Sequence, residues 1–545
     1  MTFLQLVRRE MHGSLPRLVF MSGLGGISNA AILAAVNAGA QSAGTGEVSL
    51  WSAGLFIVAL LLFVKTQHYI LIASTVEIEA IIHKLRLRLM DKVRHSELLP
   101  LDAIGRTEIV AAITKETGAL LQASNQLAFA GQGLVLVVFI GIYIAYLSFW
   151  AFALSVGILG IVAVLFHAKS EQLTHGTSEA SERENRLYDR LTDLLDGFKE
   201  VRLNQGRSDD LFDDSVEVSR TATNIKIRTQ SESFKRLVFT QSSIYLLLGA
   251  VAFVVPVVSD TQGSAITQTT MALMFVVGVC FGLVQTIPIV SAADAAADSI
   301  AKLEERLQVT ADAAEITAEP RIRFQRIEMR NVEFRYVHER SDSVFQVGPV
   351  DFTLRSGDLV FITGGNGSGK STFLKLLAGL YEPDSGEITL DGARVNEKRR
   401  GQYRSLIAAV FADYHLFRRL YGIADPDPLE VERLLEQFKL DRKTSLSDGE
   451  FKTIELSSGQ RRRLALIVSL LEKRPILMLD EWAADQDPEF RRKFYHELLP
   501  ALHRGGATVV VVSHDDRYLD EMEVQGRRLR MDEGRFVQGH PVEEH

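Results

Sequence analysis

The sequence predicts an α-helical membrane domain fused to an α/β domain, and three observations support this prediction. The first half of the chain contains five stretches without Asp, Glu, Lys or Arg, as expected for helices in hydrocarbon. The second half contains a glycine-rich loop between an apolar strand and a helix, at residues 359–377. A further apolar strand ends in two carboxylates, Asp480 and Glu481. We therefore expect a membrane domain at 1–300, a linker at 301–321 and an α/β domain at 322–545.

Length and composition exclude several classes of protein. A chain of 545 residues is too long for one hydrophobic core, which seldom grows past ~300 residues. A hydrophobic content of 47% excludes a disordered chain, and a single cysteine excludes a disulfide scaffold. The net charge of −8 argues against a basic nucleic-acid-binding surface.

The uncharged stretches predict six membrane-spanning helices. A spanning helix needs about 20 apolar residues, and the stretch at 117–168 is long enough for two helices with a tight turn between them. Buried helices of a soluble protein are the alternative, but soluble domains rarely repeat such runs so often. The expected spans are 17–38, 50–74, 126–146, 149–168, 237–258 and 271–293.

Lys and Arg residues predict the topology. Segments 77–116 and 169–236 are rich in both, whereas the short connections between the other spans carry none. Because basic segments stay in the cytoplasm, we expect a multi-pass protein of the inner (cytoplasmic) membrane with both termini in the cytoplasm. No small-residue cleavage site follows a short apolar core, so the first helix is expected to be an anchor rather than a removed signal.

The two basic segments keep apolar residues at helical spacing. We expect the membrane helices to continue through them into the cytoplasm and to contact another part of the protein at tips near 99–106 and 197–205. A solvated charged helix is the alternative. Within the second span, Lys65 and His68 are expected to line a cavity, because a charge at mid-bilayer costs at least ~2.5–3.5 kcal/mol. Lys65 could instead snorkel or face packed protein; weaker cavity candidates are Asn29, Asn37, Asn125 and Gln285.

The glycine-rich loop GGNGSGKST at 364–372 has the phosphate-loop spacing G-x-x-x-x-G-K-[ST] between a strand and a helix. Glycines let backbone N–H groups turn toward phosphate oxygens, Lys370 reaches the β- and γ-phosphates, and Ser371 offers its hydroxyl to Mg²⁺. A dinucleotide G-x-G-x-x-G loop is excluded because Lys370 stands where the third glycine should be. The expected ATP-binding residues here are Asn366, Gly367, Ser368, Gly369, Lys370, Ser371 and Thr372.

The apolar strand at 476–480 supplies the expected chemistry. Asp480 suits a Mg²⁺ ligand, and Glu481 suits a general base that polarises the attacking water. Such a pair alone is a weak signal, but downstream of a phosphate loop it indicates an ATPase.

Two further segments narrow the class. The sequence LSSGQ at 456–460, followed by an Arg-rich helix, resembles the signature motif of ATP-binding cassette (ABC) proteins. His514 follows an apolar strand and resembles the switch histidine of that family, which contacts the γ-phosphate; a histidine there is otherwise structural. Tyr336 matches the aromatic that stacks on adenine, and Asp487 matches the D-loop aspartate. The resemblance adds four ATP-binding residues, Ser457, Ser458, Gly459 and Gln460.

Six spans followed by one such domain resemble an ABC exporter half-transporter of the type I or type IV fold. Residues 410–417, 480–488 and 513–516 resemble the branch that exports cyclic peptides and siderophores, including pyoverdine precursor, syringomycin-type lipopeptides and microcin. The resemblance implies a homodimer in which each ATP, with Mg²⁺, lies between Lys370 of one subunit and Ser457–Gly459 of the other. Glu481 and His514 would then serve hydrolysis at both sites.

The expected function is ATP-driven export of a cyclic peptide, lipopeptide or siderophore precursor from the cytoplasm by alternating access. A lipid or multidrug exporter and a membrane-anchored regulatory ATPase without transport are the alternatives. Three positions depart from the general family pattern. Ala412 stands where a Mg²⁺-sensing Gln is usual, with Asp413 adjacent as a possible metal ligand. Trp482 replaces a Pro after the catalytic Glu, and Ser458 replaces a Gly of the signature.

Overall fold

A computed structural model describes residues 2–10, 15–44, 50–167, 186–188, 190–258, 263–307, 323–337, 344–524 and 526–537. The chain forms two compact units. The membrane unit contains Met1–Arg94 and Ile104–Leu307, and the α/β unit contains His95–Ala103 and Gln308–His545. Most of the predicted linker, from residue 308 onward, lies outside the described residues, while its first residues continue the last membrane helix as far as Arg306.

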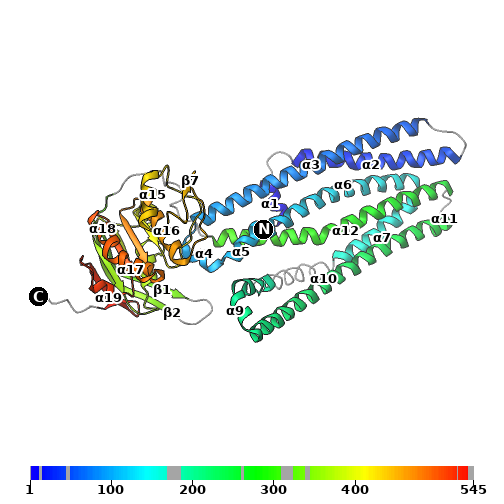
Figure 1. Cartoon of the computed structure of the whole chain (residues 1–545). Coiled ribbons are helices and arrows are strands. Elements are labelled where there is room, and N and C mark those ends of the chain that lie inside the picture. Colours follow the sequence, from blue (N-terminus) through cyan, green and yellow to red (C-terminus); the bar gives the residue numbers. More distant parts are fainter. Residues whose placement is uncertain are drawn as a thin grey trace. The chain divides into compact units, whose positions relative to one another are not determined.

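The described part of the membrane unit is helical throughout, and its long helices run alongside one another (Figure 1). A short helix α1 (Phe3–Glu10) precedes them. Helices coincide with the predicted spans, although residue 168 of the fourth lies outside the described part. The long helices are α2 (Leu15–Gly44), α3 (Leu50–His95), α6 (Thr117–Leu147), α7 (Phe149–His167), α10 (Gln205–Phe253) and α12 (Gly263–Arg306). The short ones are α5 (Arg106–Ala111), a π-helical turn (Ala112–Glu116), α9 (Phe198–Leu203) and α11 (Val255–Val258), whereas all but the last residue of α4 (Leu98–Ile104) belongs to the α/β unit.

Length and composition show which helices can cross a membrane. Within the described residues, five helical stretches are long and apolar enough: Pro16–Ser42, Leu50–His95, Glu108–Leu147, Gln205–Val258 and Ala265–Arg306. The apolar part of α7, Phe149–Ile161, is shorter. Helix α3 has 46 residues and α10 has 49. Each is therefore about 70 Å long at 1.5 Å per residue, more than twice the ~30 Å of hydrocarbon, so both must extend beyond it.

The membrane unit has its own apolar core. Leu136, Ile140 and Ile144 of α6 share this core with Leu247 and Val251 of α10. Their i, i+4 spacing places the three α6 residues on one face of that helix. A second set of contacts ties the chain start to the helix ends outside the apolar stretches. The backbone N–H of Phe3 donates to Asp294 at 2.7 Å, and Arg88 bridges Glu10 at 2.8 Å and Glu304 at 2.6 Å.

The α/β unit is built on a sheet of six described strands in the order β12-β11-β3-β10-β9-β6. All are parallel except β12, which pairs antiparallel with β11. The strands are β3 (Leu359–Thr363), β6 (Ile407–Val410), β9 (Ile476–Asp480), β10 (Thr508–Val512), β11 (Arg527–Asp532) and β12 (Arg535–Val537). An antiparallel sheet lies in the same unit, with β1 (Arg326–Val337), β2 (Val344–Arg355), β4 (Ser385–Leu390) and β5 (Ala393–Arg394).

Helices pack on both faces of the parallel sheet, so its central strands consist mainly of apolar residues. In β10, Val509 and Val511 belong to one core with Trp482 of the helical turn that follows β9, whereas Val510 and Val512 belong to the other with Phe373. The period-two alternation of a strand explains this division. The helices are α13 (Lys370–Leu377), α14 (Glu397–Arg404), α15 (Pro428–Gln437), α16 (Ser458–Leu471), α17 (Pro488–Lys493), α18 (Leu499–Arg504) and α19 (Asp516–Asp520). Shorter elements are the hairpin β7 (Leu446–Ser447) and β8 (Glu450–Phe451), a 3-10 turn (Trp482–Asp485) and a π-helical turn (Phe494–Leu498).

Candidate active site

The parallel strands bring the predicted site residues to one edge of the sheet. The phosphate loop follows β3, the two carboxylates follow β9, His514 follows β10 and Ala412–Asp413 follow β6. Because the carboxyl ends of parallel strands meet at one edge, residues far apart in sequence become neighbours. Strands β3 and β9 both pair with β10, so the phosphate loop and the carboxylates flank His514.

The phosphate loop has the conformation that its glycines predict. Gly367 and Gly369 have φ angles of 77° and 99°, in the left-handed region that favours glycine. Lys370 is 5% exposed, and its ammonium group donates to the carbonyls of Gly364 at 3.1 Å and Gly365 at 2.7 Å. Burial lowers the pKa of Lys370, while the carboxylates of Glu481 and Asp480 act in the opposite direction.

Two buried oxygen atoms at this edge fit a phosphate group and its metal ion. The Ser368 hydroxyl in the loop and Asp480 Oδ1 both lack a hydrogen-bond partner among the described residues. Asp480 accepts hydrogen bonds from the Ser371 side chain and the Ala412 backbone, and its burial raises the pKa of the carboxyl group. A carboxylate and a hydroxyl side by side are the hard oxygen ligands that Mg²⁺ prefers. When bound with ATP, Mg²⁺ would neutralise negative charge on the phosphates here.

Glu481 and His514 are paired at the end of adjacent strands. His514 Nε2 lies 2.8 Å from Glu481 Oε1, and the backbone N–H of Glu481 donates to the Val512 carbonyl at 3.1 Å. Each side chain is about one third exposed, so water can reach the pair. Glu481 also has a φ of 49°, an uncommon conformation for a residue with a side chain. The arrangement suits a carboxylate base held by an imidazole.

The signature segment begins a well-capped helix. Ser457 caps α16 by a reciprocal capping box with Gln460, and both hydrogen bonds are between backbone N–H and side chain. Gly459 allows a close approach, because a Cβ there would lie 2.7 Å from the Asp485 carbonyl. Within the described part of the chain, no hydrogen bond or ion pair joins this segment to the phosphate loop of the same chain. Ser457 and Ser458 are exposed instead.

Arginines at the start of α16 connect the signature segment to the carboxylates, which sequence patterns did not reveal. Arg462 donates to the Glu481 carbonyl, and Arg463 donates to Gln486 at 2.7 Å and Asp487 at 2.6 Å. The Arg463 guanidinium also lies 3.6 Å from the Phe490 ring centroid. Asp487 caps α17 through the Phe490 N–H, and this hydrogen bond is the main cause of its lowered pKa. The Arg-rich composition of residues 461–463 was the available signal.

Trp482, at the position where the family pattern has Pro, is a core residue. Its ring is 1% exposed, packs against Phe494 with centroids 4.5 Å apart, and donates from Nε1 to the Arg462 carbonyl at 2.9 Å. The tryptophan at this position therefore connects the segment after β9 to α16 through a hydrogen bond.

Tyr336 and Asp413 lie at the periphery of this edge. Tyr336 is half-buried near the end of β1 and packs against the core that contains Phe373. Asp413 is exposed, but its charge raises the pKa values of both Asp480 and Asp102. It therefore lies near Asp480, as expected of the residue beside Ala412.

The tip predicted near residues 99–106 overlaps the segment that belongs to the α/β unit. In this segment the two Glu97 oxygens accept from Arg400 Nη1 at 3.0 Å and Arg404 Nη2 at 2.7 Å. Leu98 packs against the core that contains Phe373. Burial raises the pKa of Asp102, with Lys375 opposing the shift. Residues 95–103 are thus anchored by charge and by apolar packing.

In the membrane unit, Lys65 and His68 do not line the cavity that the structure contains between α2, α3, α6 and α12. Both side chains are exposed. Phe63 and Gln67 line the cavity, and they share a helix face because they are four residues apart. At ~100° per residue, Lys65 points about 200° away from Phe63. Of the weaker candidates, Asn29 lines the cavity, whereas Asn37, Asn125 and Gln285 do not.

The geometry at the sheet edge defines an ATPase of the phosphate-loop class. A family model described as ABC transporter matches residues 347–484. The chain is 32% identical to ATP-binding protein SyrD of Pseudomonas syringae pv. syringae, over 97% of this chain and 96% of that protein. The chain therefore belongs to the ABC transporter family. Its α/β unit binds ATP with Mg²⁺ and hydrolyses ATP in a reaction coupled to transport.

Two further comparisons agree with this assignment. The chain is 32% identical to Nod factor export ATP-binding protein I of Burkholderia lata, over 38% of this chain and 69% of that protein. The structure of a bacterial Atm1-family ABC exporter with ATP bound covers 98% of this chain and 95% of its own, with a TM-score of 0.76 and 17% identity. The chain thus has the exporter fold over nearly its whole length, which confirms the predicted fold class.

Proposed function

We propose that the protein exports a cyclic peptide, lipopeptide or siderophore precursor from the cytoplasm and that ATP hydrolysis drives this movement. One observation carries the proposal. The phosphate loop, the Asp480–Glu481 pair and His514 meet at one sheet edge in a chain that also contains long apolar helices and has the exporter fold over nearly its whole length. The similarity to SyrD along the full chain supports the same branch of exporters.

Each residue of the site has a role in hydrolysis. The phosphate loop binds the β- and γ-phosphates through backbone N–H groups, the Ser368 hydroxyl and the Lys370 ammonium. Asp480 and Ser371 would hold Mg²⁺ when it is bound with ATP. Glu481 accepts a proton from the attacking water, and the water oxygen bonds to the γ-phosphorus as the bond to ADP breaks. His514, at 2.8 Å, orients the Glu481 carboxylate and contacts the γ-phosphate.

The protein acts as a homodimer in this proposal. Ser457 and Ser458 are exposed, and among the described residues no hydrogen bond or ion pair joins them to the phosphate loop of their own chain, so they are available to a nucleotide held by Lys370 of the partner. Arg462 and Arg463 would transmit this contact to Glu481 and to Asp487. Both composite sites contain Glu481 and His514, so both hydrolyse ATP.

Closure of two α/β units around ATP would drive alternating access. ATP can shift such an equilibrium only through contacts that exist in the closed state, and a composite site provides them. Residues 95–103 follow α3 directly in the chain, and Glu97 fixes them to Arg400 and Arg404 of the α/β unit. This segment would transmit movement to α3. The distribution of Lys and Arg supports cytoplasmic termini, and the exporter fold supports outward movement of the cargo.

Transport of defined cargoes tests the proposal. The full-length protein would be reconstituted into inside-out proteoliposomes. These would be supplied with a tritiated neutral cyclic hexapeptide of Gly, Leu and Phe. A fluorescent phospholipid and a cationic dye serve as competing cargoes. ATP-dependent accumulation of the peptide above both supports the proposal. Accumulation of only the lipid or the dye would show a lipid or multidrug exporter, and hydrolysis without any accumulation would show a regulatory ATPase.

A further inference from the structure

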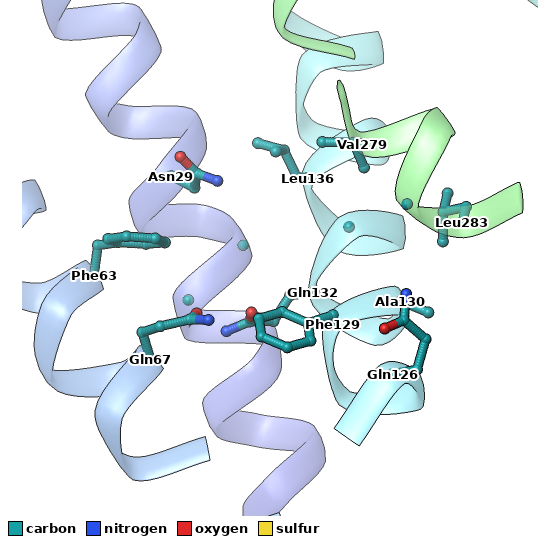
Figure 2. Close-up of a pocket in the computed structure, with 14 residues that line it drawn as sticks. Asn29, Phe63, Gln67, Gln126, Phe129, Ala130, Gln132, Leu136, Val279 and Leu283 are labelled. Atoms are coloured by element: carbon teal, nitrogen blue, oxygen red, sulfur yellow. The ribbon is translucent and has the colours of Figure 1, made fainter. Parts of the chain in front are cut away.

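The membrane unit contains a cavity of about 250 Å³ between α2, α3, α6 and α12, and Figure 2 shows the side chains around it. It is smaller than the ~300–1,000 Å³ of sites that enclose a whole drug-sized ligand. Its volume is equivalent to about eight waters at ~30 Å³ each. The cavity is therefore of a size to hold one or two residues of a larger molecule.

Neutral amide groups dominate the polar part of the cavity wall. Four carboxamide side chains line it, and two phenylalanines lie among them: Asn29, Gln67, Gln126, Gln132, Phe63 and Phe129. None of the fourteen lining residues carries a charge. The wall offers no carboxylate to pair with a cation, and no Lys or Arg to pair with a phosphate or carboxylate group. The wall therefore favours an uncharged ligand with both polar and apolar parts.

Two buried amide atoms in this wall have no hydrogen-bond partner within the described chain, Gln67 Oε1 and Gln132 Nε2. The side chains extend toward one another from α3 and α6 (Figure 2). One atom is an acceptor and the other is a donor. A buried polar group without a partner costs about 1–3 kcal/mol, so a ligand that satisfies both atoms gains binding energy. A peptide group, with one N–H and one C=O, has the matching pair.

Glycines hold the cavity in shape. A Cβ at Gly25 would lie 2.8 Å from Gln132 Nε2, and one at Gly133 would lie 2.8 Å from Val279 Cγ1. These helices approach one another closely because the glycines lack side chains, a common arrangement in membranes. By contrast, a Cβ at Gly282 would meet no atom within 4 Å, although this residue lines the cavity. A larger side chain at Gly282 would fill open space.

We propose that this cavity is a cargo subsite that recognises a peptide bond, with Gln67 accepting from the cargo N–H and Gln132 donating to the cargo C=O. Phe63 and Phe129 contact the adjoining apolar side chain of the cargo. The inference rests on the proposed export of peptide-like cargo and names the groups that select it.

Binding of two forms of one probe tests the subsite. The probe is the tritiated cyclic hexapeptide, compared with its backbone-N-methylated form, on full-length protein in lipid nanodiscs without nucleotide. N-methylation removes the donor that Gln67 requires, and we expect about tenfold weaker binding to the wild type. In Gln67→Met the two forms should bind equally weakly, whereas Gln132→Met should weaken both forms and keep the tenfold difference. Gln122→Met, on an exposed part of α6, is the matched control.

A pair of glycine variants tests the subsite without changing either glutamine. Gly282→Leu should reduce probe binding at least tenfold, and Gly278→Leu should not, since a Cβ there also meets no atom and the residue does not line the cavity. Equal binding of both probe forms by the wild type, or wild-type binding by the Gln67, Gln132 and Gly282 variants, would overturn the subsite. If the binding results overturn the subsite but the wild type takes up the peptide with ATP, the proposed function stands without the subsite. If the wild type neither binds nor takes up any peptide, both are wrong.

Discussion

Glu97→Gln should loosen residues 95–103 from the rest of the α/β unit by an amount that the structure allows one to estimate. Glu97 is 16% exposed and receives hydrogen bonds from two arginines. Each arginine has a second partner, Glu382 at 2.9 Å for Arg400 and the Gly379 carbonyl at 2.8 Å for Arg404. The glutamine oxygen can still accept one hydrogen bond. The variant thus loses about one hydrogen bond between charged groups, worth about 1.5–3 kcal/mol.

Hydrogen–deuterium exchange measures this loss directly. At 1.4 kcal/mol per tenfold change, amides of α4 should exchange about 10- to 150-fold faster in Glu97→Gln. The Leu101 amide is a suitable probe because it donates to the Glu97 carbonyl. Glu382→Gln is the matched control, since it removes an exposed partner of the same Arg400, a pair worth about 0–1 kcal/mol. Equal exchange in the two variants would refute the reasoning that burial makes Glu97 the anchor.

Three further predictions concern the active-site edge. Trp482→Phe should lower the thermal unfolding midpoint in detergent, because the Arg462 carbonyl loses its indole donor. A buried carbonyl without a donor costs about 1–3 kcal/mol, and an unchanged midpoint would contradict this prediction. Asp480→Asn should abolish Mg²⁺-dependent hydrolysis. Because burial raises the pKa of Asp480, its protonated form stabilises the metal-free fold at low pH and this contribution is lost as pH rises through the folded-state pKa. We therefore expect Asp480→Asn to have a higher unfolding midpoint than the metal-free wild type only at pH values above that pKa. A variant that is more stable only below that pKa would contradict this prediction. Gly369→Ala should weaken ATP binding at least tenfold in nucleotide titrations. The φ of Gly369 is 99°, and a Cβ there would lie 3.1 Å from Val347 Cγ2, so alanine would strain the loop. An affinity equal to that of the wild type would show that the loop adjusts.

Local sequence patterns predicted the features whose residues lie close together along the chain. The phosphate loop needs glycines and a lysine within nine residues, and the spans need only length and apolar composition, so both could be found without a structure. The strand ends could be paired because parallel strands place Asp480 and His514 at one edge. The departure at Trp482 was visible in the sequence, but its burial under α16 was not.

Features built from distant residues could not be predicted in this way. Glu97 pairs with Arg400 across 303 positions, and nothing in either local sequence marks the other as a partner. In the membrane unit, the cost of burying charge directed attention to Lys65, whereas the cavity is lined by uncharged amides such as Gln67. Helical periodicity separates the faces of α3 but does not show which face meets α6. The structure shows that α2 approaches both helices at Gly25, where a Cβ would lie 2.8 Å from Gln132 Nε2 of α6 and 3.3 Å from Thr66 Oγ1 of α3.

The central claim is that proton abstraction at Glu481 drives cargo movement. The most direct test measures ATP hydrolysis and peptide uptake in the same inside-out proteoliposomes for the wild type and Glu481→Gln. The account predicts that the variant still binds ATP but loses at least 99% of both activities, because the amide cannot accept the proton from water. Uptake that persists in Glu481→Gln, or hydrolysis that persists at the wild-type rate, would contradict it.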